Sequence, residues 1–273
     1  KTKHAKYAQY HRKEESAFWL CRADSLDMNI ISVQIPDNIA NTFAEKLELM
    51  NKLKLRHMEL SMQELSLEDV SSSEIIFARN QLIDEGCTVH LYKSSLSVSQ
   101  RDSVRRLFRN AHLMEVSNVQ LDLYNGFPDD IEYCFDVAES YGIPLLIENQ
   151  NDGLFRNSTQ LEEFLKRHNN RDCGVLFNPL EFLRTGLHPF LNVFYAGRVK
   201  NHVAALRIND GLYMSKEAVF PGHGNGELKE LISAMKARSY DGFFSLTPYL
   251  PGCTAQDLMD MITWLRQILK GVF

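Results

Sequence analysis

Eight polar side chains recur along the chain, each at or near the end of a short apolar run. They are Gln34, Glu59, His90, Asp122, Glu148, Asn178, Arg207 and Thr247, and successive members are 25, 31, 32, 26, 30, 29 and 40 residues apart. Carboxylates and an imidazole can move protons, and a guanidinium can stabilise a developing anion. Because burying unpaired polar groups costs free energy, we expect the set to line one wet cavity.

Each of these residues also has a purely structural interpretation. His90 can be a hydrogen-bonded core histidine, and Glu59 and Asp122 can be members of structural ion pairs. Asn178 precedes a proline and can simply end its strand. Arg207 interrupts an apolar run, and a charge there needs a partner, which a facing carboxylate can supply.

The apolar runs that precede these residues predict buried strands. They are short and rich in Val, Ile, Leu and Phe, as strands covered on both faces should be. The predicted strands are 29–35, 55–60, 87–92, 118–123, 144–148, 173–177, 202–208 and 242–246. Helical apolar spacing lies between them, for example in 41–53 and 73–83. The pairs Thr159 with Glu162 and Thr254 with Asp257 predict helix N-termini.

Eight strands alternating with helices predict a (β/α)8 TIM barrel, with an open doubly wound sheet as the alternative. No linker divides the chain, so we expect one barrel domain over 28–273. Residues 1–27 precede the first strand, and their aromatic residues suggest a helical extension on the outside or bottom of the barrel. In this fold, chemistry occurs at the C-terminal ends of the strands, where the eight polar residues fall.

Composition excludes several classes of protein. The chain has 273 residues, 44% hydrophobic and 24% charged, which excludes collagen-like and low-complexity chains. A net charge of −5 argues against nucleic-acid binding, and no run is long enough for a membrane span. Five scattered cysteines predict reduced core residues and a cytoplasmic protein. The sequence starts at Lys1, so a removed signal peptide stays an alternative.

Several segments together resemble the xylose isomerase-like TIM barrels, which include sugar isomerases and epimerases. They are HMEL (57–60), PLLIENQ (144–150), GVLFNP (174–179), LRIND (206–210) and the run from 221 to 248 that begins PGHGNG and ends YDGFFSLTP. The resemblance covers about 29–273. It implies the same barrel fold and, by analogy with the relatives, a homodimer.

The resemblance also implies a divalent metal held by Glu, Asp, His and Glu after the fifth to eighth strands. The matching positions here are Glu148, Asn178, Arg207 and Thr247, so three of the four ligands differ. Asn and Thr offer only neutral oxygens, and Arg is a permanent cation without an acceptor. We therefore expect no metal at this position and an Arg207–Glu148 ion pair in its place. A bound Mn²⁺, Mg²⁺, Co²⁺ or Zn²⁺ is the alternative.

The sequence leaves two hypotheses for function. One is an isomerase or epimerase with an altered, metal-free site, in which Glu148 and His90 transfer protons and Arg207 stabilises the intermediate. The other is a carbohydrate-binding barrel without catalysis. In either case we expect a small polyhydroxylated or anionic ligand. Its predicted contacts are Glu59, Lys93, Asp122, Asn178, Asp210, His223 and Thr247.

Overall fold

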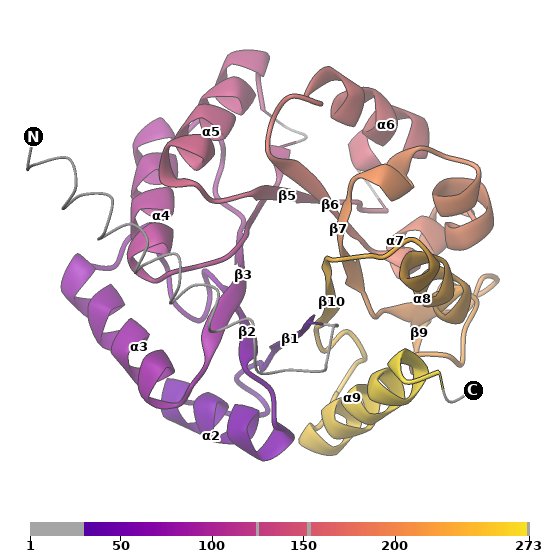
Figure 1. The fold of residues 1–273 in the computed structure, drawn as a ribbon, viewed down its shortest axis with the longest axis horizontal. Coiled ribbons are helices and arrows are strands. Elements are labelled where there is room, and N and C mark those ends of the chain that lie inside the picture. The colour runs from indigo at the N-terminus through magenta and orange to yellow at the C-terminus, as the bar shows by residue number, and fades with distance from the viewer. Residues whose placement is uncertain (1–29, 124–125, 152–153, 272–273) are drawn as a thin grey trace, which may run out of the picture.

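The computed structural model describes residues 30–123, 126–151 and 154–271, and these form a closed parallel barrel inside a ring of helices (Figure 1). The prediction of a (β/α)8 barrel is confirmed, and the open-sheet alternative is excluded because the first strand pairs with both the second and the last. The helical extension predicted for residues 1–27 lies outside the described residues.

Eight parallel strands build the barrel in the order β1, β10, β7, β6, β5, β4, β3 and β2. Their bounds are Ile30–Gln34 (β1), His57–Ser61 (β2), Thr88–Ser94 (β3), Val119–Leu121 (β4), Leu145–Glu148 (β5), Cys173–Phe177 (β6), Val203–Arg207 (β7) and Phe243–Leu246 (β10). Each overlaps one of the predicted strands. A short antiparallel pair, Asp210–Gly211 (β8) and Ala218–Val219 (β9), forms a hairpin after β7.

The helices follow the strands along the chain and surround them. The α-helices are Phe43–Leu53 (α2), Ser72–Asp84 (α3), Arg101–Leu113 (α4), Pro128–Tyr141 (α5), Ser158–Arg167 (α6), Pro179–Arg184 (α7), Leu228–Ala237 (α8) and Ala255–Leu269 (α9). Three further helical segments are Leu154–Arg156 (η2), the π-helix Pro189–Tyr195 (η3) and Val199–Asn201 (η4). None of the helices in the described ranges has the length and apolar character needed to cross a bilayer.

The helix starts test the predicted N-terminal signals. Thr254 and Asp257 form the expected reciprocal capping pair at the start of α9. The pair predicted at Thr159 and Glu162 was wrong, because α6 begins one residue after Asn157, whose side chain accepts from the Thr159 amide. Asn is at least as good a cap as Thr, so the helix starts two residues earlier than a Thr159 cap would allow.

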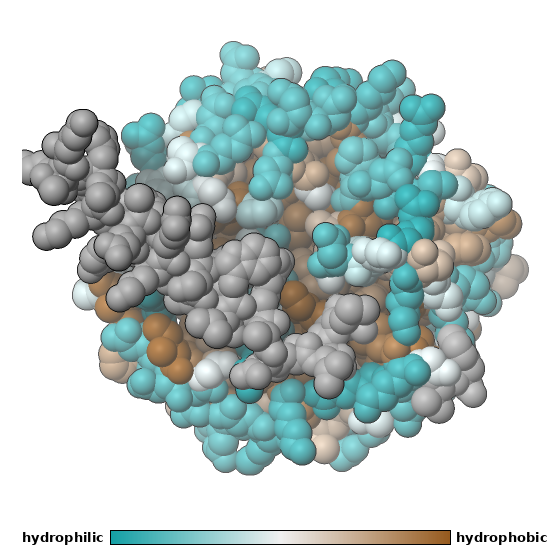
Figure 2. All heavy atoms as spheres, in the orientation of Figure 1, coloured by the Kyte–Doolittle hydropathy of each residue, from teal (hydrophilic) through white to brown (hydrophobic). Residues whose placement is uncertain are grey.

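Two layers of apolar side chains hold the fold together. The larger lies between strands and helices, and a smaller cluster fills the barrel interior, with Leu91, Leu146, Leu176, Ala205 and Phe243 as its buried members. On the face drawn in Figure 2, hydrophilic residues cover most of the rim, and hydrophobic residues show chiefly inside the ring. The interior is therefore packed, so a ligand can bind only at an end of the barrel.

The length of β3 and a bulge within it decide where its side chains lie. Met58 and Glu59 are consecutive in β2, but they pair with Val89 and Leu91, so His90 has no partner in the register. Beyond the bulge, β3 continues to Ser94. The strand therefore ends beside Lys93, not His90, and Lys93 reaches the C-terminal end of the barrel.

Candidate active site

A polar cavity of about 330 Å³ opens where the strands end. It is lined almost entirely by charged and amide side chains from the C-terminal ends of β1, β3, β5, β6, β7 and β10 and the loops that follow them. The lining residues are Gln34, Lys93, Glu148, Asn149, Gln150, Asn178, Glu181, Arg207, Asn209, Thr247 and Pro248. The predicted residues Lys93, Glu148, Asn178, Arg207 and Thr247 are thus brought together.

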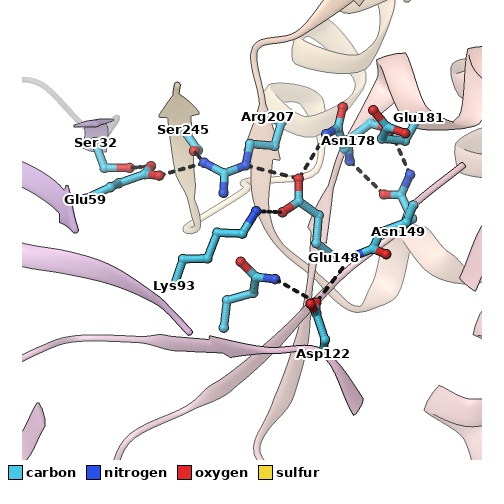
Figure 3. Close-up of polar contacts among 12 residues, drawn as sticks. Ser32, Glu59, Lys93, Asp122, Glu148, Asn149, Asn178, Glu181, Arg207 and Ser245 are labelled. Carbon is cyan, nitrogen blue, oxygen red and sulfur yellow. Dashed lines mark hydrogen bonds and ion pairs between the residues drawn. The ribbon is translucent and has the colours of Figure 1, made fainter. Parts of the chain in front are cut away.

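Arg207, the last residue of β7, lies at the floor of this cavity between two carboxylates (Figure 3). Its Nη1 donates to Glu59 Oε2 at 2.6 Å and to the Ser245 hydroxyl, and its Nε donates to Glu148 Oε1 at 3.3 Å. Burial lowers the pKa of the guanidinium, but the charges of Glu148 and Glu59 outweigh burial and raise it. Arg207 is therefore a fixed cation, and its Nη2 has no partner among the described side chains.

Glu148 is surrounded by groups that favour its charged form. Asn178 Nδ2 donates to its Oε1 at 2.9 Å, and Lys93 Nζ lies 3.7 Å from its Oε2. Burial raises the pKa of this carboxyl, but the charges of Arg207 and Lys93 and the bond from Asn178 lower it overall. An ionised carboxylate with a lowered pKa is a weak base, so Glu148 is better suited to anchoring cations than to accepting a proton.

Two other carboxyl groups at the mouth have the opposite tendency. Burial raises the pKa of Glu181, in the first turn of α7, although Arg184 partly opposes this. Burial also raises the pKa of Asp122, which accepts from Gln120 and Gln150. Glu181 lines the cavity directly, and a raised pKa moves a carboxyl towards the range useful for proton transfer at neutral pH.

The placement of His90 corrects the sequence prediction. Its ring contacts His57 and Phe243, with centroids 5.1 Å and 4.6 Å away, at the strand starts. It lines a separate cavity of about 450 Å³ at the N-terminal end of the barrel. Burial and the nearby His57 lower the pKa of His90 to about 4. His90 is therefore a neutral residue at the wrong end for chemistry at the mouth.

Asp210 and His223 lie outside the cavity lining as well. The Asp210 carboxylate is buried and accepts from the backbone amides of Gly211, Gly222, Gly224 and Gly226 at 2.7–3.0 Å. It therefore holds the glycine-rich loop in place rather than facing a ligand. His223 in that loop is exposed and packs against Phe220.

The remaining predicted contacts support the cavity from outside it. Glu59 lies under Arg207 and accepts from Ser32, and Asp122 orients the lining residue Gln150. Sequence reasoning did not assign Asn149, Gln150, Glu181 or Asn209 to the site. The first two follow Glu148 in the polar run IENQND, which was a usable signal, whereas nothing local marks Glu181 or Asn209.

Comparison with known proteins identifies the fold family. The model of the xylose isomerase-like TIM barrel matches residues 99–268, more than half of the chain. The chain belongs to this family. None of the curated proteins matches it.

Solved structures share the barrel at low sequence identity. A xylose isomerase domain protein from Planctomyces limnophilus has a TM-score of 0.70 at 15% identity, covering 89% of this chain and 98% of its own. A xylose isomerase-like TIM barrel protein from Mycobacterium smegmatis, in complex with magnesium, has 0.69 at 17%, covering 89% and 97%. A D-allulose 3-epimerase from Methylomonas sp. has 0.66 at 12%, covering 90% and 98%.

The residues present do not fit the divalent metal that the resemblance to xylose isomerase-like barrels implies. Glu148, Asn178, Arg207 and Thr247 do share one cavity, but only Glu148 is an anionic ligand. The guanidinium of Arg207 already occupies the Glu148 and Glu59 oxygens that would face an ion. Within the described ranges, no three His, Cys, Asp or Glu side chains gather as a metal-binding group.

Proposed function

We propose that this member of the xylose isomerase-like family isomerises or epimerises a small polyhydroxylated or carboxylated compound, without a resident metal. The observation that carries the proposal is the position of Arg207. Its guanidinium lies at the floor of the mouth cavity, at a family ligand position, and is held by two carboxylates. A fixed cation at that place can stabilise the negative charge of an enediolate.

The proposed reaction begins with the transfer of one carbon-bound proton. A carboxylate removes the hydrogen from the carbon next to the substrate carbonyl, and the electron pair of the C–H bond shifts to form an enediolate. Arg207 Nη2 and Lys93 Nζ stabilise the oxyanion. To give the isomer, the proton returns to the former carbonyl carbon and the hydroxyl proton passes from its oxygen to the former carbonyl oxygen. To give the epimer, water or a second acid protonates the opposite face of the same carbon, and the carboxylate releases its proton to solvent.

Glu181 is the better candidate for the proton acceptor, because its pKa is raised whereas that of Glu148 is lowered. Glu148 holds Arg207 and Lys93 in position for the oxyanion. His90 has no part in this reaction, since it lies at the other end of the barrel.

A carbohydrate-binding barrel without catalysis is the second candidate. Glu148 lies at a family ligand position, but its carboxylate already pairs with Arg207, Asn178 and Lys93. These contacts favour the second candidate, because they leave Glu148 unavailable for catalysis. Such a cavity can bind a polyol even if no proton is moved.

Exchange of carbon-bound hydrogen tests the first candidate directly. The protein is incubated in D2O with D-fructose, D-tagatose, D-allulose, L-sorbose and the matching sugar acids, in EDTA or in Mn²⁺, Mg²⁺, Co²⁺ or Zn²⁺. We expect deuterium next to the carbonyl of at least one compound, at the same rate in EDTA, and loss of exchange in Arg207→Met. Exchange only with added metal contradicts metal-free chemistry, and binding without exchange supports the second candidate.

A further inference from the structure

The guanidinium at the floor of the mouth keeps one of its nitrogens free. Nη1 and Nε of Arg207 are engaged by carboxylates and a hydroxyl, whereas its Nη2 makes no hydrogen bond within the described residues. Nη2 is not one of the buried, unpartnered atoms of those residues either, so it has surface open to the cavity that Arg207 lines. Two N–H donors of a fixed cation therefore face the space available to a ligand.

Lys93 brings a second set of free donors to the same place. Its Nζ lies 3.7 Å from Glu148 Oε2, which is too long for a hydrogen bond, and its side chain is 45% exposed. Arg207 lies against the same carboxylate, and Figure 3 shows its free nitrogen pointing towards the side from which Lys93 reaches Glu148. An ammonium and a guanidinium on one side of a cavity can hold a carboxylate between them.

Acceptors for the hydroxyl groups of a ligand come from two other lining amides. The Oδ1 atoms of Asn178 and Asn209 are buried, so a ligand cannot reach them. Gln34 and Gln150 direct their NH2 ends to carboxylates, and their oxygens make no hydrogen bond within the described residues. A ligand that uses all the free groups of the cavity therefore carries both hydroxyls and an anionic group.

The charges of the site leave room for one carboxylate. The two cations are matched by the two carboxylates that they contact, Glu59 and Glu148, so these four side chains carry no net charge. Glu148 is also shielded from a ligand, because its Oε1 accepts from Arg207 and Asn178. A carboxylate adds one negative charge to this balanced set, whereas a phosphate adds about two.

We propose that the mouth cavity selects a polyhydroxylated carboxylic acid over the neutral alcohol with the same carbon chain, and that the ligand carboxylate bridges Arg207 Nη2 and Lys93 Nζ. This inference rests on the proposed function and narrows its substrate class to sugar acids. A hydrogen bond from a cation is stronger to a carboxylate than to a hydroxyl, which gives the preference. Where the carboxylate is next to the reacting carbonyl, the same two cations also contact the oxyanion that forms there.

Matched ligand pairs test the selection. Titration calorimetry at pH 7 compares three acids with the alcohols that share their carbon chains: D-gluconate with D-glucitol, D-galactonate with D-galactitol, and D-ribonate with ribitol. D-Glucitol 6-phosphate is the phosphorylated probe. We expect at least one acid to bind roughly tenfold more tightly than its alcohol, and more tightly than the phosphate. Equal binding within every pair, no binding in all three pairs, or tighter binding of the phosphate overturns the proposal.

Three variants separate the local contact from the overall charge of the protein. Lys93→Met removes the ammonium from a half-exposed side chain that makes no hydrogen bond, so we expect unchanged thermal stability and a preference for the acid of about twofold or less. Lys93→Arg keeps the charge and should keep most of the preference. Lys166→Met on the exposed side of α6 changes the net charge equally and should behave as the wild type does. If Lys93→Met keeps the full preference, or Lys166→Met also loses it, Lys93 does not hold the carboxylate.

The two proposals fail in different ways. If acids bind with the expected preference and no compound exchanges hydrogen in D2O, the isomerase proposal is wrong and the selection of acids stands. If a neutral ketose exchanges hydrogen and no acid binds more tightly than its alcohol, the selection is wrong and the isomerase proposal stands.

Discussion

The two ends of the barrel handle buried polar groups in opposite ways. At the C-terminal mouth, Arg207, Glu59 and Glu148 keep their charges and neutralise one another at distances of 2.6 and 3.3 Å. At the N-terminal end, His90 lies against His57 and Phe243, and burial keeps both histidines neutral at pH 7 by lowering their pKa values.

The C-terminal mouth is therefore suited to act on a ligand, whereas the N-terminal end mainly closes the barrel. Charged groups that hold one another in fixed positions can form new hydrogen bonds with a substrate without having to reorient first. Neutral rings packed on one another offer mostly apolar contact and resist ionisation. Substitutions at the two ends should therefore have different consequences, and four of them test the contrast.

Removing the central cation should have the largest effect. In Arg207→Met, Glu59 and Glu148 remain buried without their shared partner, so we expect a loss of about 3–5 kcal/mol in the free energy of unfolding, measured by urea denaturation. The combined variant with Glu59→Gln and Glu148→Gln should recover most of that loss. If Arg207→Met alone is as stable as the wild type, the charges at the mouth are not interdependent.

Neutralising the proposed proton acceptor should have the second largest effect. Glu181→Gln keeps the shape of the side chain and removes its base, so we expect hydrogen exchange into the responsive sugar to fall at least about a hundredfold while polyol binding persists. In the wild type, exchange should decline as the pH falls through the raised pKa of Glu181, because the protonated form cannot accept. Glu163→Gln on α6 is the matched control. Full exchange in Glu181→Gln would move the role to Asp122 or Glu148.

The N-terminal end should respond to acid instead. The pKa of His90 is about 4 in the folded chain and 6.5 ordinarily, so the unfolded chain binds the proton first as the pH falls. The contribution of neutral His90 to the free energy of unfolding is fully present above pH 6.5. It declines by up to about 3 kcal/mol between pH 6.5 and 4. His90→Phe should lose less over that range in urea denaturation, and its polyol binding at pH 7 should be unchanged. An identical acid decline in both proteins would contradict this assignment.

A smaller effect is expected from a neighbour of His90. Asn118 donates to the His90 carbonyl at 3.0 Å and lines the same N-terminal cavity. Asn118→Ala should lose about 1 kcal/mol of stability through that hydrogen bond, with no change in ligand binding at the mouth. Weaker polyol binding in this variant would mean that the two ends are coupled.

The strands were predictable because their apolar runs follow directly from burial on both faces. Each of the eight runs overlaps a strand of the barrel, including the short β4 at Val119–Leu121. A carboxylate partner for Arg207 was also predictable, since a buried charge requires an opposite one, and the family resemblance pointed to Glu148 as that partner. The second partner, Glu59, comes from a strand 148 residues earlier in the chain, and only the closed barrel brings it close.

The error at His90 has a definite physical cause. The strand was predicted to end at residue 92, but β3 runs from Thr88 to Ser94, so His90 is only its third residue and Lys93 lies next to its C-terminal end. The bulge at His90 arises from pairing with β2 and changes which side chains beyond it face the interior, and no pattern within 87–92 reveals it. Glu181 and Asn209 were missed for a related reason, because their importance comes from neighbours on other strands rather than from their own sequence context.

The carboxylate of Asp210 limits how the glycine-rich loop after β7 can move. Three amides of the loop 222–226 converge on it, and a Cβ atom at position 224 would lie 2.4 Å from its Oδ1. Although residues 222 and 223 face solvent, the amide hydrogens of Gly222, Gly224 and Gly226 should exchange as slowly as those of the strands. A loop held in this way is a rigid segment after β7, so it should keep its shape whether or not a ligand is bound.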